Sequence, residues 1–220
     1  MTPQKLIAEL LGTAFLLAAV VGSGIMAERL AGGNMAIALL ANAIATGAAL
    51  VTLILMFDPI SGAHFNPAVS FSASLSGEMS WRDAALYSIV QIIGAFLGVI
   101  AANLMFDLPA LFPSARVRTG FGLWLGEFVA TFGLVGVIVS VSRRYKAFHT
   151  AVAVASYITA AYCFTSSTSF ANPAVTLARS WTDTFAGIRP IDAPGFILAQ
   201  VLGAVAATYL FNWLVPRKHE

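Results

Sequence analysis

One tripeptide occurs twice in this chain, each time before an apolar stretch that is too short to cross a lipid bilayer. The two copies are Asn66-Pro67-Ala68 and Asn172-Pro173-Ala174. Asn is favoured as a helix N-cap, and Pro fits the first helical position, where its missing N–H needs no partner. A membrane-spanning helix needs about 20 residues, far more than the apolar segments 68–76 and 174–181 provide. The duplication therefore predicts two half-helices that begin inside a membrane protein.

The composition supports a membrane protein with several spans. The 220 residues are 59% hydrophobic and 10% charged, whereas a soluble domain has about 25% charged residues. Six longer apolar segments approach spanning length: 6–26, 36–57, 84–106, 121–141, 150–166 and 195–214. We therefore expect an all-α membrane protein with six transmembrane helices and two re-entrant half-helices, in one transmembrane domain over residues 1–220.

Three landmarks recur in the same order in the two halves of the chain. They are a glutamate inside a long apolar segment, the Asn-Pro-Ala triplet, and the pattern Gln-x-x-Gly-Ala. In the first half they are Glu9, the triplet at Asn66 and residues 91–95. In the second half they are Glu127, the triplet at Asn172 and residues 200–204. Matched landmarks indicate an internal duplication, with repeats over 1–107 and 120–216. Because each repeat contains three spans, the second must insert upside down relative to the first.

Inverted repeats bring the N-termini of the two half-helices together near the middle of the membrane. Helix ends at this depth are tolerated only where protein buries them or water lines them. The pattern therefore predicts an aqueous path beside two carboxamides, those of Asn66 and Asn172, and two positive helix ends.

The segment 60–69, Ile-Ser-Gly-Ala-His-Phe-Asn-Pro-Ala-Val, resembles the aquaporin and glycerol-facilitator family, as do the second Asn-Pro-Ala and the Glu, Asn and Gln order. The resemblance covers essentially the whole chain. It implies a passive channel in which Asn66 and Asn172 donate to a passing oxygen while the helix ends repel cations. It also implies a homotetramer, and carboxylates at Glu9 and Glu127 that support the pore loops. His64 is similar to the family's loop histidine, for which packing and gating are alternatives.

The selectivity filter departs from the family pattern. Family members commonly carry Arg directly after the second Asn-Pro-Ala, where this chain has Val175. Counting back from each Asn without gaps assigns the other filter positions to Thr46, Ala160 and Ser169. All four side chains are uncharged and small or medium in size. They predict a wide filter without the fixed charge, suited to glycerol-like polyols and neutral metalloid hydroxy acids such as arsenous acid.

Arg179 follows Val175 by one helical turn and leaves two interpretations open. It could reach back as a displaced filter charge. We expect instead that it lies at the outer mouth or pairs with Asp183.

Two other classes of function compete with a channel. A proton- or ion-coupled secondary transporter also uses inverted repeats and broken helices, but needs a titratable group in its path. The candidates are Glu9, Glu127, His64 and Asp58, and none is clearly a pore residue. An intramembrane enzyme lacks support, because there is no paired His/Asp metal pattern and no Gly-x-Ser-x-Gly. We expect no catalytic residue, metal site or cofactor, and a net charge of +2 does not suggest nucleic acid.

The charges favour cytoplasmic termini, consistent with a bacterial inner or plasma membrane. Seven basic residues would then lie on the cytoplasmic side: Lys5, Arg82, Arg143, Arg144, Lys146, Arg217 and Lys218. Five would lie outside: Arg29, Arg116, Arg118, Arg179 and Arg189. The N-terminal apolar run is expected to be a retained span, not a signal peptide, because the repeat includes it. The single Cys163 excludes an internal disulfide and is expected to pack within a helix.

Overall fold

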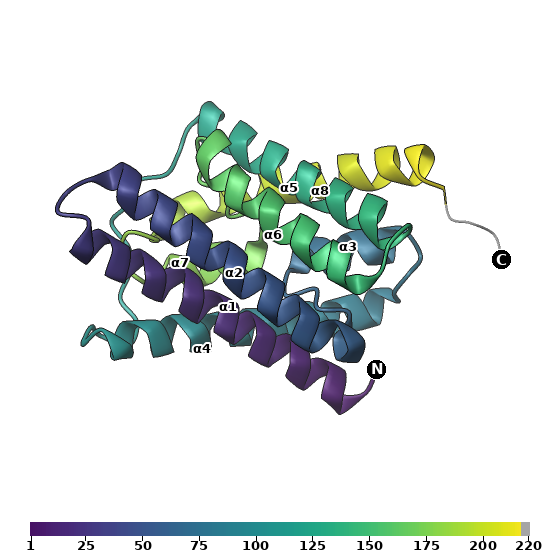
Figure 1. Cartoon of the computed structure of the whole chain (residues 1–220), viewed down its shortest axis with the longest axis horizontal. Coiled ribbons are helices and arrows are strands. Elements are labelled where there is room, and N and C mark those ends of the chain that lie inside the picture. The colour runs from purple at the N-terminus through teal and green to yellow at the C-terminus, as the bar shows by residue number, and fades with distance from the viewer. Residues whose placement is uncertain (217–220) are drawn as a thin grey trace.

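The fold is all-helical. A computed structural model describes residues 1–216, so Arg217 and Lys218 lie outside the described residues. The helices are α1 (Pro3–Leu30), α2 (Met35–Ser61), α3 (Pro67–Leu75), α4 (Trp81–Met105), α5 (Phe121–Ser142), α6 (Ala147–Phe164), α7 (Pro173–Arg179), the 3₁₀ turn η1 (Pro190–Asp192) and α8 (Ala193–Leu214) (Figure 1). Six of them are long and apolar enough to span a bilayer. The expected six spans and two short helices are confirmed.

The long helices form two groups of three that face one another. Helix α1 packs against α2 and α4, α5 packs against α6 and α8, and the α2–α6 contact joins the groups. The N-terminus and the end of α8 lie at the same end of the molecule in Figure 1. The short helices α3 and α7 lie toward opposite ends and contact each other inside the bundle. This is the arrangement that an inverted repeat of three spans requires.

Two glycines at matching positions allow the helices of each group to touch. A Cβ added at Gly94 of α4 would collide with the main-chain oxygen of Leu10 in α1. One added at Gly203 of α8 would lie 2.5 Å from the main-chain oxygen of Phe128 in α5. Small residues let helix backbones approach closely in membranes. The repeat therefore duplicates its packing contacts as well as its motifs.

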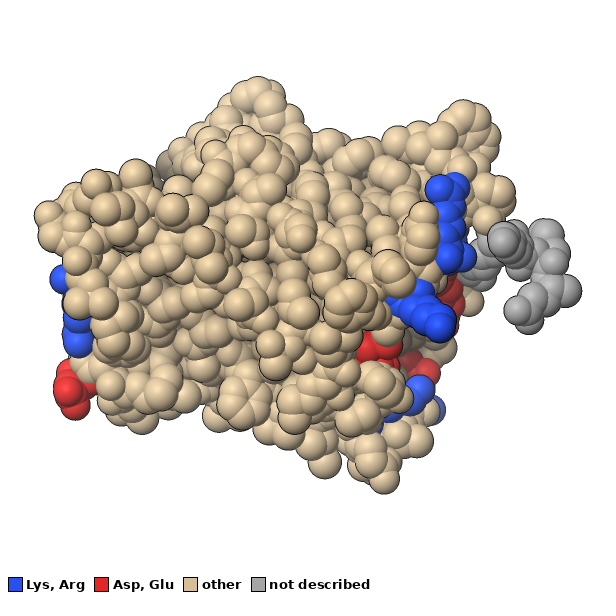
Figure 2. Space-filling view, viewed as in Figure 1, with Lys and Arg blue, Asp and Glu red and all other residues tan. Residues whose placement is uncertain are grey.

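The visible surface has charged residues at its two ends and an uncharged middle (Figure 2). On the face shown in Figure 2, Lys, Arg, Asp and Glu lie at the two ends of the long axis, and a broad uncharged zone separates them. An uncharged belt of this kind suits the hydrocarbon core of a bilayer. Cys163, expected as a packing residue, is exposed on α6, because it lies on the side of that helix away from its neighbours.

Candidate functional site

Each Asn-Pro-Ala asparagine caps a half-helix with its own side chain. Oδ1 of Asn66 accepts from the N–H of Ala68 at 2.9 Å. Oδ1 of Asn172 accepts from the N–H groups of Ala174 and Val175 at 3.0 and 3.3 Å. Both residues have extended backbones and are followed by Pro at the first helical position. The local sequence thus accounts for where both half-helices begin.

The two asparagines also tie the halves of the chain together. Nδ2 of Asn66 donates to the main-chain oxygen of Ala171 at 2.7 Å, and Nδ2 of Asn172 donates to that of Phe65 at 2.8 Å. An amide NH₂ group has two hydrogens. Each asparagine therefore holds the opposite loop with one hydrogen and has a second one that can bond to a molecule in the cavity.

The loops that lead into α3 and α7 have unusual backbones at matching positions. Ala63 and Phe65 have φ values of 49° and 50°, and Ser169 and Ala171 have 50° and 48°. Non-glycine residues seldom adopt this left-handed conformation, and it persists only where the surroundings enforce it. The enforcing contacts come from two buried carboxylates.

Glu9 and Glu127 lie fully buried behind these loops. Glu9 accepts hydrogen bonds from the N–H groups of His64 and Phe65 at 3.0 and 2.7 Å. Glu127 accepts from the N–H groups of Phe170 and Ala171, both at 2.8 Å. A buried carboxylate that accepts several hydrogen bonds is a strong structural anchor. The contacts of both glutamates are therefore those of loop supports.

A glutamine completes each carboxylate anchor. Nε2 of Gln91 donates to Glu9 at 2.8 Å and to the Ser70 hydroxyl at 3.1 Å. Nε2 of Gln200 donates to Glu127 at 2.6 Å and to the Thr176 hydroxyl at 2.8 Å. The two hydroxyls belong to α3 and α7, so each glutamine links a carboxylate to a half-helix. Sequence reasoning found the glutamines as landmarks but missed Ser70 and Thr176, each four residues after an Asn.

One cavity of about 270 Å³ passes between the half-helices, with room for several waters or a small solute. Asn66 and Asn172 both line it. Its lining continues to Asp58, Glu78 and Thr150 on one side of the asparagines and to residues of the expected filter on the other. Much of its wall is apolar: Leu16, Val20, Leu50, Ile54, Leu134, Ile138, Val154 and Ile158. A few polar groups in an apolar channel are what a neutral, hydrogen-bonding solute needs.

Three of the four expected filter residues line the cavity, namely Thr46, Ser169 and Val175. The fourth, Ala160, is exposed on α6 and does not line it. The cavity-facing residues of α6 are spaced by four, from Thr150 to Tyr162, and a residue two positions from them is rotated by about 200° around the helix. Counting from Asn172 without gaps missed this phase.

Tyr162, not Ala160, is the α6 residue at this level. It is buried, and its hydroxyl is 3.2 Å from the Thr46 hydroxyl of α2. The filter region therefore contains an aromatic ring, which the sequence reasoning did not foresee. No signal in the sequence pointed to it, because the phase of α6 relative to the cavity is known only from the structure.

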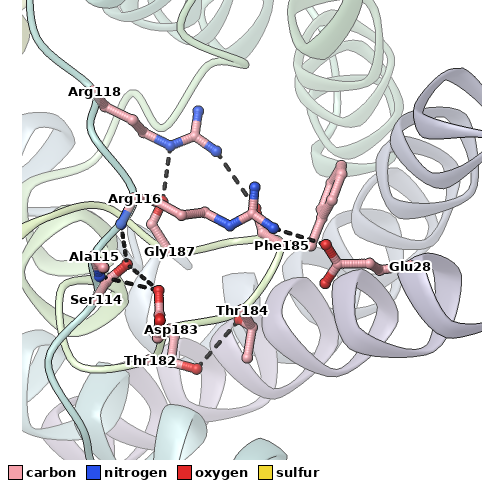
Figure 3. Close-up of polar contacts among 10 residues, drawn as sticks. All are labelled: Glu28, Ser114, Ala115, Arg116, Arg118, Thr182, Asp183, Thr184, Phe185 and Gly187. Atoms are coloured by element: carbon pink, nitrogen blue, oxygen red, sulfur yellow. Dashed lines mark hydrogen bonds and ion pairs between the residues drawn. The ribbon is translucent and has the colours of Figure 1, made fainter. Parts of the chain in front are cut away.

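Arg179 forms no ion pair with Asp183 among the described residues. It is 2% exposed and lines the cavity together with Val175. Asp183 instead accepts from the N–H of Ala115 at 3.0 Å and from the Ser114 hydroxyl at 3.3 Å (Figure 3). The expected pair with Asp183 is therefore absent, because the loop after α7 folds back over Arg179; its place at the outer mouth stays a prediction.

That returning loop, 180–189, is held by the segment that joins the two halves. Figure 3 shows Arg118 reaching from the joining segment to the returning loop, where its Nε donates to the main-chain oxygen of Gly187 at 2.8 Å. Burial, and secondarily the charge of Arg116, lower the pKa of Arg118 to about 10. Arg116 forms a partly exposed 2.7 Å ion pair with Glu28, and its guanidinium lies 5.8 Å from the ring centroid of Phe185 in the same loop.

His64 lines the cavity on the Asp58 side of the asparagines. Its Nδ1 is 3.0 Å from the Ser70 hydroxyl, and its ring meets that of Tyr87 edge-on at 5.4 Å. The ring is therefore both packed and in contact with the cavity.

Comparisons with known proteins agree with this geometry. Residues 2–166 match the family model described as Major intrinsic protein. The chain is 56% identical to Aquaglyceroporin AqpS of Rhizobium meliloti (strain 1021), over 96% of this chain and 90% of that protein. It is 32% identical to Aquaporin NIP1-4 of Oryza sativa subsp. japonica, over 95% and 76% respectively.

A solved structure has the same fold. The X-ray structure of the aquaglyceroporin from Plasmodium falciparum superposes with a TM-score of 0.75, covering 97% of this chain and 96% of that one at 22% identity. The family match, the curated relatives and the two Asn-Pro-Ala half-helices agree, and the chain belongs to the major intrinsic protein family.

Proposed function

We propose that this chain is a passive channel for water and small uncharged solutes, with glycerol-like polyols as the main class. The observation that carries the proposal is the cavity that passes between two half-helix N-termini, beside the carboxamides of Asn66 and Asn172. Each carboxamide retains one hydrogen for a passing oxygen, and the positive helix ends disfavour cations. Of the two Asn-Pro-Ala triplets only the asparagines line the path, whereas Pro67, Ala68, Pro173 and Ala174 do not; the proposed constriction is therefore at the two asparagines.

The name of the bacterial relative, an aquaglyceroporin, supports glycerol as a solute. Neutral metalloid hydroxy acids such as arsenous acid present three hydroxyls on a compact centre, as glycerol does on a short chain. A path with apolar walls and isolated hydroxyl groups suits both. We therefore include these acids in the proposed solute class.

A coupled transporter is the weaker candidate. It would need a carboxylate that takes up and releases a proton in the solute path. Glu9 and Glu127 accept main-chain and glutamine hydrogen bonds instead, and removing those bonds would release the pore loops. Family membership likewise supports a channel, not an enzyme.

The proposed assembly is a homotetramer in a bacterial plasma membrane, with one pore per protomer and cytoplasmic termini. Arg143, Arg144 and Lys146 support that orientation because they lie together between two spans. Native mass spectrometry in mild detergent and in nanodiscs is expected to show four copies. Monomers alone under both conditions would exclude the tetramer.

Stopped-flow measurements on proteoliposomes test the function. Water, glycerol, urea and arsenous acid are compared on the same vesicles, with empty liposomes as the control. We expect water and glycerol permeabilities well above the control and no dependence on a pH or sodium gradient. Uphill accumulation of solute driven by either gradient would establish a coupled transporter.

A further inference from the structure

Arg179 is a buried cation in the wall of the cavity. It lies one helical turn beyond Val175 on α7, so both residues share the helix face that lines the cavity. Burying a charge is costly unless hydrogen bonds or an ion pair compensate for it. No carboxylate among residues 1–216 forms an ion pair with Arg179.

Two contacts hold the guanidinium in place. Its Nε donates to the main-chain oxygen of Ala186, and its central carbon lies 3.4 Å from the ring centroid of Phe170. The ring of Phe170 also lines the cavity. None of the hydrogen bonds within the described chain uses Nη1 or Nη2. These two nitrogens can therefore donate to a molecule in the cavity.

We propose, on the basis of the proposed channel function, that Arg179 is the cation of the outer filter. It would take the role of the arginine that family members commonly carry at the position of Val175. The opposite part of the filter is the Thr46–Tyr162 hydroxyl pair, which joins α2 to α6. Instead of a wide, uncharged opening, the filter has a guanidinium fork, an aromatic ring and paired hydroxyls. This arrangement selects neutral solutes with several hydroxyl oxygens and rejects cations.

Arg118 positions this cation without lining the cavity. It holds the main-chain oxygen of Gly187, directly after the Ala186 oxygen that Arg179 holds, and its guanidinium lies 5.2 Å from the ring centroid of Phe170. The two arginines therefore share one loop and one ring. Gly187 lets this loop lie close to Ser114 of the joining segment, because an added Cβ would collide with the Ser114 hydroxyl and the main-chain oxygen of Thr182.

The test moves the arginine charge from position 179 to position 175, one helical turn earlier on α7. Full-length protein is reconstituted as wild type, Arg179→Val and the double variant Val175→Arg/Arg179→Val. Water permeability, the glycerol-to-water ratio and potassium leak are measured on the same vesicles. We expect Arg179→Val to raise potassium leak severalfold, and the double variant to return it toward wild type. Arg29→Gln is the control, because Arg29 at the end of α1 contacts Phe106 and not the returning loop, and it should behave as wild type.

Gentler variants keep the test informative if Arg179→Val does not fold. Arg179→Lys keeps the charge but loses the planar fork, so leak should stay low while the glycerol-to-water ratio changes. Tyr162→Phe keeps the ring and removes the hydroxyl, so the same ratio should fall. Arg118→Lys should shift the ratio in the direction of Arg179→Lys, with water permeability retained, because Arg118 acts through the shared loop.

The outcomes separate this inference from the proposed function. If wild-type vesicles pass neither water nor glycerol better than empty liposomes, both the channel function and the assignment of Arg179 are wrong. If wild type conducts both solutes and the folded Arg179 variants match its leak and its ratio, the channel function stands. The assignment of the filter to Arg179 is then wrong.

Discussion

Asn66 and Asn172 each donate a hydrogen bond to the main-chain oxygen of the residue that precedes the other, at 2.7 and 2.8 Å. Each loop is thus locked by the cap residue of the opposite half-helix. Each half therefore helps to hold the loop of the other, because both bonds cross between the repeats. This reciprocity is why substitutions at either position should affect both structure and permeation.

Replacing Asn66 or Asn172 by Asp should reduce water and glycerol permeability severalfold. An ionised carboxylate cannot donate, so it loses the bond to the opposite loop and the donor in the cavity, and it adds negative charge beside the helix ends. Stopped-flow flux and ion leak at equal reconstitution measure the effect. Asn34→Asp is the control, since Asn34 caps α2 on an exposed loop, where Asp caps equally well. Wild-type flux in both pore variants would remove these residues from the path.

Replacing Val175 by Arg should lower the glycerol-to-water permeability ratio. A second guanidinium would enter the cavity beside Arg179 and occupy part of its opening. Water could still pass, whereas a polyol or a trihydroxy metalloid would meet a steric barrier. Thr46→Phe, on the opposite wall, should add to the effect. An unchanged ratio would mean that Val175 lies outside the narrow part of the path.

Replacing Glu127 by Gln should destabilise the fold without creating or abolishing ion coupling. The new NH₂ group would face a donor, either the Gln200 amide or a loop N–H. An unsatisfied buried donor costs about 1–3 kcal/mol. The thermal midpoint in detergent should fall, while Glu28→Gln, at an exposed ion pair, should change it little. A wild-type midpoint would show that the carboxylate does not anchor the loop.

Replacing Gly203 by Ala should cost about 1–3 kcal/mol, as over-packing of a tight contact does. The added Cβ would lie 2.5 Å from the main-chain oxygen of Phe128, so α5 and α8 would have to separate. Gly122→Ala is the matched control, because its Cβ would meet nothing within 4 Å. Thermal unfolding of both variants in the same detergent tests the comparison, and equal midpoints would contradict the close helix contact.

Water and glycerol permeability should not change when the pH of the outer solution is varied between about 6 and about 8, because Arg118 stays charged. The pKa of Arg118 is lowered to about 10, which still leaves the side chain charged across this range. Because the folded pKa lies below that of a free arginine, the cost of burying the charge is relieved only as pH rises above about 10. Flux measured with the outer pH varied alone tests this. A change that Arg118→Lys abolishes would contradict it.

The sequence by itself determined the architecture and the start of each half-helix. The Asn-Pro-Ala caps act locally: Asn accepts from the N–H groups just after it and Pro begins the helix, so neighbours in the chain suffice. The order of Glu9, Asn66 and Gln91 and its repetition revealed the inverted duplication. The resemblance implied that the glutamates support the pore loops, and both carboxylates accept hydrogen bonds from loop N–H groups.

The filter was decided only by the tertiary structure. Counting residues back from Asn172 selected Ala160, but the phase of α6 puts Tyr162 into the cavity and Ala160 outside it. Likewise, nothing near Arg179 in sequence indicates that a loop from beyond α7, held by Arg118, folds back and buries it. Filter contacts join residues of separate helices and loops, and their geometry depends on helix rotation and loop path, which residue spacing does not encode.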